Sequence, residues 1–205
     1  MRPGGGAAKG AAFEREVASA LSRWVSGNQR TDLFRRSVLS GGSFTVAQRK
    51  EIEDHGTPGD IMATHPLAFG FATRFAIECK HKASLDFEVL LFNPERSFLV
   101  KTFEKTQRDA YKIGQRALVV AKQNRRPTVL FTDRETGEII RASSPRSRLR
   151  YIWHALAGEY FMMEWLMFLR CIRPDALLVE AAHRTIEERS YDSDRGPASH
   201  GQRRG

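Results

Sequence analysis

The amino-acid sequence predicts an α/β fold of the α+β kind, with a central mixed β-sheet flanked by helices. The predicted elements follow one another in the order α-β-β-α-β-β, with a C-terminal extension after them. Two predicted strands, 117–121 and 128–131, are almost continuously apolar, which is typical of strands buried on both faces. The chain has 205 residues, 41% of them hydrophobic, which is enough for one main core.

The first helix is predicted to begin at Lys9. Apolar residues recur after it at helical spacing, at Phe13, Val17, Leu21 and Trp24. Gly27 and Asn28 then provide a helix stop. Residues 1–8 are rich in glycine, and we expect them to be disordered.

The elements of the middle of the chain are predicted from their apolar runs and turns. A long loop is expected over 35–59, and strands 60–63 and 71–81 are expected to pair as a hairpin. An amphipathic helix follows over 100–114, and a basic turn over 123–127 joins the two apolar strands.

The C-terminal part is less regular. Residues 159–165 favour a strand and 166–172 a helix, and the pattern does not separate the two. Pro174 stands in the first turn of a predicted helix that ends at Arg189. We therefore expect a main domain over 9–172, a C-terminal helix over 173–189 and a mobile tail over 190–205.

Composition restricts the class of protein. The N-terminus lacks the apolar run of a secretory signal, and the most apolar stretch, 152–169, carries residues that are costly in a bilayer. Two cysteines make a disulfide framework improbable and favour a reducing cytoplasm. The net charge of +9, from 25 arginines and 8 lysines against 24 acids, is typical of a protein that binds a polyanion. A coding bias toward arginine on a solvated surface is the alternative.

Four residues carry the predicted chemistry: Glu14, Asp60, Glu78 and Lys80. Glu78 and Lys80 lie two apart on a strand, so their side chains point to the same side. Carboxylate oxygens converging at a sheet end suit Mg²⁺ or Mn²⁺, and a neighbouring lysine can orient and help deprotonate a water for attack on phosphorus. The alternative is that Glu78 and Lys80 form a salt bridge on an exposed edge strand.

Pro58-Gly59-Asp60 followed by Glu78-Cys79-Lys80 resembles the PD-(D/E)XK nuclease signature, and the opening Lys9-Gly10-Ala11-Ala12-Phe13-Glu14 resembles the first helix of archaeal-type Holliday junction resolvases. The resemblance covers roughly 9–135 and implies a restriction-endonuclease-like core, with 9–172 as the nuclease domain. It implies that Glu14, Asp60, Glu78 and the carbonyl of Cys79 bind the metal, and that Lys80 is the catalytic lysine. Two departures are Gly59, which separates the proline from the aspartate, and the long 36–58 loop.

Further residues are expected to contact DNA. Gln107 and Tyr111 fit Gln-x-x-x-Tyr, which resembles a helix motif of RecB-like nucleases; the alternative is a tyrosine packed in the core. Ser40 and Ser43 flank two glycines in a loop, Lys82 follows the catalytic lysine together with His81, and Arg125 and Arg126 occupy the basic turn. Such side chains bind backbone phosphates without reading sequence.

The expected function is therefore that of a Mg²⁺- or Mn²⁺-dependent DNA endonuclease, most like a Holliday junction resolvase, that acts as a homodimer because two symmetric nicks need two sites. The alternatives are a restriction-type or end-processing nuclease of the same superfamily and a catalytically silent nucleic-acid-binding module. No nucleotide-binding loop is present, so ATP is not expected to be used. A compact, basic chain of this kind suits a phage-encoded protein, which we expect to act in the host cytoplasm.

Overall fold

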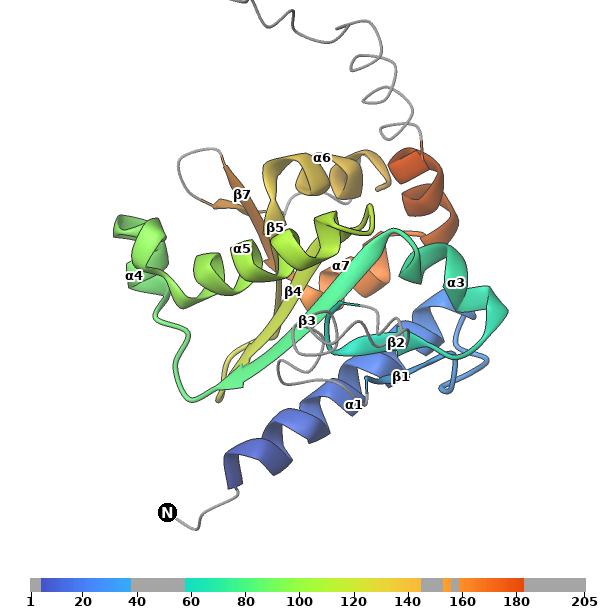
Figure 1. Ribbon diagram of the computed structural model, residues 1–205, viewed down its shortest axis with the longest axis horizontal. Helices are drawn as coiled ribbons and strands as arrows, with labels where there is room; N and C mark the ends of the chain where they lie inside the picture. The colour runs from blue at the N-terminus through green and yellow to red at the C-terminus, as the bar shows by residue number, and fades with distance from the viewer. Residues whose placement is uncertain (1–4, 38–57, 145–152, 156–158, 183–205) are drawn as a thin grey trace, which may run out of the picture.

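The computed structural model describes residues 5–37, 58–144, 153–155 and 159–182. Its central sheet has five strands in the order β3-β4-β5-β7-β6, and a separate two-stranded sheet pairs β1 with β2 (Figure 1). β3 and β4 are parallel and the other neighbours are antiparallel, so the sheet is mixed, as predicted. The helices are α1 (Gly5–Val25), α3 (Pro66–Ala72), α4 (Phe87–Phe92), α5 (Phe98–Tyr111), α6 (Arg134–Ala142) and α7 (Trp165–Cys171), with a short 3-10 helix at Pro94–Arg96. The strands are β1 (Phe34–Arg36), β2 (Ile61–Ala63), β3 (Phe75–Lys82), β4 (Arg116–Gln123), β5 (Val129–Asp133), β6 (Trp153–Ala155) and β7 (Tyr160–Glu164).

Strand β4 explains why the sheet has a core on both faces. Its residues 117–121 are all buried, but alternate side chains enter different clusters. Leu118 and Val120 join the cluster that α1, α3 and α7 cover, whereas Ala117, Val119 and Ala121 join the cluster that α4 and α5 cover. The near-continuous apolar run therefore predicted burial on both faces correctly.

Helix α1 packs on the sheet through its predicted apolar face. Phe13, Val17, Leu21 and Trp24 are buried, and the Trp24 indole nitrogen donates to the Ile172 carbonyl at 2.8 Å. The helix begins at Gly5, so residues 5–8, which were expected to be disordered, belong to it. Gly27 and Asn28 have positive φ just beyond its last turn, as a helix stop requires.

The predicted hairpin between 60–63 and 71–81 is wrong. α3 separates β2 from β3, β2 pairs with β1 instead, and β3 begins at Phe75. Pro66 stands at the first turn of α3, and the His65 side chain accepts a hydrogen bond from the Leu67 amide at 3.2 Å, which caps the helix. The helix is too short and too apolar for its period to be told from that of a strand.

The remaining predictions were correct for some elements and missed others. α5 and the β4–β5 hairpin were predicted within a few residues, and the ambiguous 159–172 stretch is strand β7 followed directly by α7. Residues 174–182 are helical, and the rest of the predicted terminal helix and tail lies outside the described residues. The sequence did not predict β1, which falls at the start of the expected 35–59 loop, or α4 and α6.

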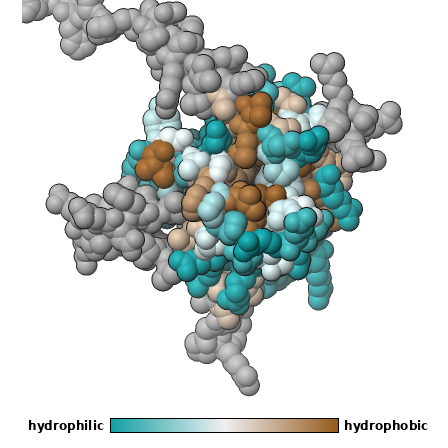
Figure 2. Space-filling model, turned by 90° about the vertical axis from the view of Figure 1, so that its right-hand side faces the viewer, coloured by the Kyte–Doolittle hydropathy of each residue, from teal (hydrophilic) through white to brown (hydrophobic). Residues whose placement is uncertain are grey.

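Two features of the surface complete the fold. Within the part of the chain that the structure describes, no helix is long and apolar enough to cross a bilayer. Figure 2 faces the side on which α3 lies in Figure 1, and it shows apolar residues scattered among hydrophilic ones. Leu67 and Phe69 of α3 are exposed, whereas Ala68 and Phe71 are buried, so this helix packs on the core by one face only.

Candidate active site

Glu78 and Lys80 lie next to each other on β3, the edge strand of the central sheet. The Lys80 ammonium forms an ion pair with the Glu78 carboxylate, as the salt-bridge alternative expected, and also lies 3.8 Å from Asp60 Oδ2. Cys79 between them is buried in the core on the opposite face. The two residues therefore belong to a group of three charges rather than to an isolated surface pair.

Asp60 is held against the open edge of β3 by its backbone and by its side chain. Its amide donates to the Ile77 carbonyl at 2.6 Å, and its own carbonyl accepts from the Ser37 amide at 2.7 Å. Its carboxylate Oδ2 accepts from the Cys79 amide at 2.8 Å. Because these bonds join Asp60 to two neighbouring segments, its carboxylate has a fixed position beside Glu78 and Lys80.

Gly59 makes this close approach possible. Its φ is +95°, and a Cβ atom at this position would overlap the Ile77 carbonyl. Any other residue would push Asp60 away from β3 or strain the turn. The departure that Gly59 makes from the superfamily pattern is therefore a requirement of this turn.

The Cys79 carbonyl lies on the same open edge. In an extended strand the amide and carbonyl of one residue point to the same side. Since the Cys79 amide points to Asp60, its carbonyl oxygen lies on the side of Asp60 and away from β4. The backbone oxygen of Cys79 is thus a possible ligand beside the carboxylates of Glu14, Asp60 and Glu78.

Glu14 reaches the group from α1. It is buried and forms an ion pair with Arg36 of β1, the strand that pairs with β2. Its negative charge contributes to the raised pKa of Asp60. The structure therefore brings Asp60, Glu78 and Lys80 together, with Glu14 near enough for its charge to act on Asp60 and with Arg36 paired to Glu14.

Burial and like charges act on Asp60 in the same direction. Burial, the Glu78 charge and the Glu14 charge raise its pKa to about 6, although Lys80 and the Cys79 amide oppose them. Burial lowers the pKa of Lys80, but the charges of Glu78 and Asp60 outweigh it, so the net pKa is raised. Lys80 is therefore an ammonium at neutral pH.

The donor chemistry of the site fits a hard divalent cation. Three carboxylates and a backbone carbonyl are oxygen ligands, and a cation would offset both the burial and the neighbouring acids that raise the pKa of Asp60. Among the described residues, however, no three His, Cys, Asp or Glu side chains form a ready metal-binding group. Glu78 and Glu14 turn instead to Lys80 and Arg36, so each would share its carboxylate with its partner or leave that partner to bind a metal.

The predicted DNA contacts do not all lie near this group. Lys82 is exposed at the end of β3, with its ammonium 3.6 Å from the centre of the Phe98 ring. Gln107 links α5 to the sheet, because its side-chain oxygen accepts from the Ala117 amide at 2.8 Å. Tyr111 is 79% exposed, so it is not packed in the core.

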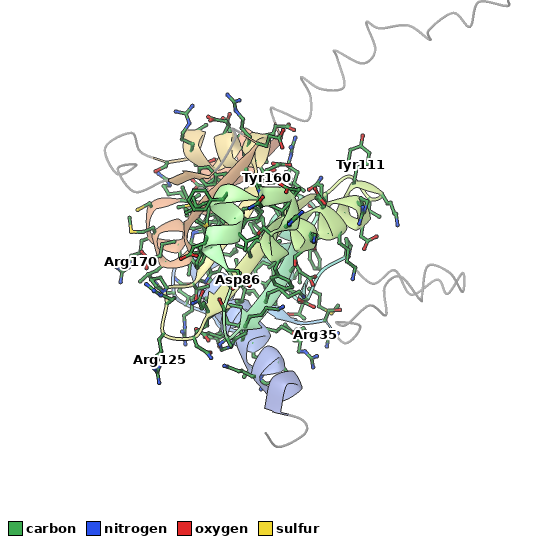
Figure 3. All side chains as sticks on the ribbon, turned by 90° about the vertical axis from the view of Figure 1, so that its left-hand side faces the viewer. Arg35, Asp86, Tyr111, Arg125, Tyr160 and Arg170 are labelled. Carbon is green, nitrogen blue, oxygen red and sulfur yellow. The ribbon has the colours of Figure 1, made fainter. Side chains whose placement is uncertain are left out.

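The basic turn lies on another side of the molecule from Tyr111. Arg125 and Arg126 are exposed in the β4–β5 turn, and Figure 3 shows Arg125 and Tyr111 projecting in different directions. Arg125 has a positive φ of 60°, which is uncommon for a residue other than glycine. Ser40 and Ser43 lie outside the described residues.

Arg36 was not predicted as a site residue, and neither was its neighbour Arg35. The two differ in the structure, because Arg36 pairs with Glu14 whereas Arg35 contacts the sulfur of Met62. Their register against β2 decides which one meets the acid. The short apolar run Leu33-Phe34 could have indicated a strand before Arg35 and Arg36, and both of its residues are buried in the structure.

The mixed sheet is compatible with the fold of the PD-(D/E)XK superfamily, and Asp60, Glu78 and Lys80 meet at its edge. Over residues 6–172 the chain matches the family described as "Phage putative PDDEXK endonuclease", and it belongs to that family. The matched region extends well past the 9–135 segment on which the resemblance was based, through β7 and α7. No curated protein and no solved structure matches the chain.

Proposed function

We propose that this protein is a divalent-metal-dependent endonuclease that hydrolyses phosphodiester bonds of DNA. The observation that supports this most directly is the position of Lys80 between Glu78 and Asp60 at an open strand edge. The family to which the chain belongs, and its charge of +9, support a nucleic acid as substrate.

Four groups would hold the metal: the carboxylates of Glu14, Asp60 and Glu78, and the carbonyl oxygen of Cys79. When bound, Mg²⁺ or Mn²⁺ supplies charge neutralisation for the phosphate oxygens and a more acidic water. Asp60 is suited to be the fixed ligand because three hydrogen bonds hold it in place. Glu14 and Glu78 are suited to turn toward the metal, since each has a flexible side chain that is paired with a partly exposed cation.

Lys80 acts as a donor in this proposal. As an ammonium it cannot accept a proton, but it can donate hydrogen bonds to a water or to a phosphate oxygen at the strand edge. If Glu78 turned to a bound metal, Lys80 would lose this partner and could contact the substrate. Its role is to orient the attacking water and to stabilise negative charge on the phosphate.

For the substrate we propose a branched DNA, in particular a four-way junction. This rests on the opening segment from Lys9 to Glu14, which resembles the first helix of junction resolvases. A junction needs two symmetric cuts, and a two-fold homodimer would supply two sites. Lys82, Arg125 and Arg126 are proposed to bind backbone phosphates near the cut.

The experiment compares a synthetic four-way junction, a linear duplex and a flap DNA, each incubated with the protein in Mg²⁺ and in EDTA. Paired nicks in the junction alone support the full proposal. Cutting of the duplex or flap at a similar rate would support an endonuclease but overturn the junction preference. Intact DNA in all three, with a retained gel shift, would show a binding protein without nuclease activity.

A further inference from the structure

Three residues from distant parts of the chain meet beyond the end of the candidate active site. Lys9 of α1 donates to Asn124 Oδ1 at 2.5 Å, and His81 Nε2 lies 3.2 Å from the same oxygen. Lys9 and Asn124 are 115 residues apart in the sequence. In Figure 1 the lower ends of β3 and of the β4–β5 hairpin lie near the N-terminal part of α1, which is where these contacts form.

Both contacts are hydrogen bonds that the Asn124 side-chain oxygen accepts. An ammonium can only donate, so the Asn124 atom that faces Lys9 is the oxygen of its amide. That oxygen can only accept, so His81 Nε2 carries a proton there. Two donors, one of them a full cation, therefore converge on an uncharged carbonyl. A phosphate oxygen would bind such a pair of donors more strongly, because charge-assisted hydrogen bonds are stronger than neutral ones.

The surroundings of this cluster also favour an anion. Lys122 is the neighbour of His81 in the β3–β4 register, and both side chains pack on the Phe13 ring. Lys122 is paired with Glu16, which offsets its charge in part. Arg125 follows Asn124 directly and is exposed. Asn124 and Lys9 are exposed as well, so the asparagine can leave when a ligand enters.

The cluster lies at a fixed distance from the candidate catalytic residues. Lys9 precedes Glu14 by five residues, which is about 7.5 Å along the axis of α1. A phosphate held by Lys9 would therefore lie within a few nucleotides of the cut. On the sheet, His81 directly follows Lys80 but points to the α1 side, where it meets Phe13.

We propose that Lys9 and His81 form a binding site for one backbone phosphate of the DNA, within a few nucleotides of the phosphate that is cut, and that Asn124 occupies this site until DNA binds. The inference rests on the proposed function for the identity of the ligand. It adds a site that would fix the register of the bound strand against Lys80.

Three variants separate this role from a structural one. Lys9→Ala removes the cation and should weaken DNA binding by about three- to tenfold, while reducing the slope of log K against log salt by about 0.9. Asn124→Asp leaves the shape unchanged but fills the site with a permanent anion, and should weaken binding by about tenfold or more. Asn124→Ala should bind DNA within about threefold of the wild type, because it only vacates the site.

Arg141→Ala is the matched control. Arg141 is exposed, lies on α6 at the opposite end of the molecule from the start of α1, and pairs only with Glu138 among its described side-chain contacts (Figure 1). The substitution Arg141→Ala removes one positive charge without touching the cluster. The slope of log K against log salt for this variant should therefore equal that of the wild type. Melting temperatures of all four variants identify any loss of folding.

The decisive experiment measures binding in Ca²⁺, by fluorescence anisotropy, with DNA that carries a single neutral methylphosphonate at successive positions. At one position the methylphosphonate should weaken DNA binding by the wild-type protein but not by Lys9→Ala. In unmodified DNA that the wild-type protein cuts in Mg²⁺, that position should lie within a few nucleotides of the cut. If every position affects both proteins equally, or if Asn124→Asp binds as the wild type does, the site does not exist. Because the readout is binding, a protein that binds in this way but cuts nothing would refute the proposed function alone.

Discussion

Replacing Asp60 with asparagine should stabilise the metal-free protein at neutral pH. Asparagine keeps an oxygen that can accept the Cys79 amide, but it carries no charge to bury. The pKa of Asp60 is raised from 3.8 to about 6, so ionising its carboxyl in the folded protein costs free energy relative to the unfolded chain. Two pKa units correspond to about 3 kcal/mol of unfolding free energy at pH 7.5.

The sign of the pH dependence follows from the same shift. Between the unfolded pKa near 4 and the folded pKa near 6, the folded protein holds the extra proton, so stability falls as pH rises. The wild type should therefore recover most of this difference on acidification. At pH 4.5 the advantage of Asp60→Asn should shrink to about 1 kcal/mol.

The assay is urea unfolding in EDTA, followed by tryptophan fluorescence, at pH 7.5 and pH 4.5. Asp32→Asn is the control, because Asp32 is exposed and its pKa is lowered by a hydrogen bond from Arg30, so its replacement should not stabilise the protein. With Ca²⁺ in place of EDTA, the wild type should gain stability and Asp60→Asn should gain much less. An Asp60→Asn protein that is less stable than the wild type at pH 7.5, or a gap that does not narrow at pH 4.5, would refute the reasoning.

Further predictions concern the turn, the ion pair and DNA binding. Gly59→Ala should lower the free energy of unfolding in urea by at least about 2 kcal/mol, because Gly59 has a positive φ and lies against the Ile77 carbonyl. Gly27→Ala, with open space around it, should lower it by about 1 kcal/mol. Equal losses would contradict the close approach of Gly59 to β3. Arg36→Ala should raise the affinity for Ca²⁺ in calorimetry by several-fold, because Glu14 loses a competing cation, and Arg35→Ala should not; identical affinities would show that the ion pair does not compete. Binding of DNA should weaken steeply as salt rises, with a slope of about −0.9 per phosphate contact, and a flat response would exclude a phosphate-binding surface.

Elements with a clear period were predictable from the sequence. The apolar face of α1 and the buried β4–β5 hairpin are long enough for their patterns to be unambiguous. α3 was not, since a seven-residue apolar helix has too few turns to show a helical period. Its omission led to the false hairpin between β2 and β3, because two strands in sequence were assumed to pair directly.

The candidate site was predictable as a set of residues but not as a network. Glu78 and Lys80 share a face by the two-residue period of a strand, which the sequence shows directly. The pairing of Glu14 with Arg36 depends on the register of β1 against β2, and the meeting of Lys9 with Asn124 depends on the packing of α1 against the hairpin end. Such long-range contacts have no signal in a single sequence.

The account depends most on Lys80 as a participant in phosphodiester hydrolysis. Its direct test measures single-turnover cleavage of a four-way junction in Mg²⁺ by Lys80→Ala, beside DNA binding in Ca²⁺ by the same protein, with Lys105→Ala as an exposed-lysine control. Cleavage should fall by at least about 100-fold while binding stays within a few-fold of the wild type. Cleavage by Lys80→Ala at the wild-type rate would contradict the assignment of this site.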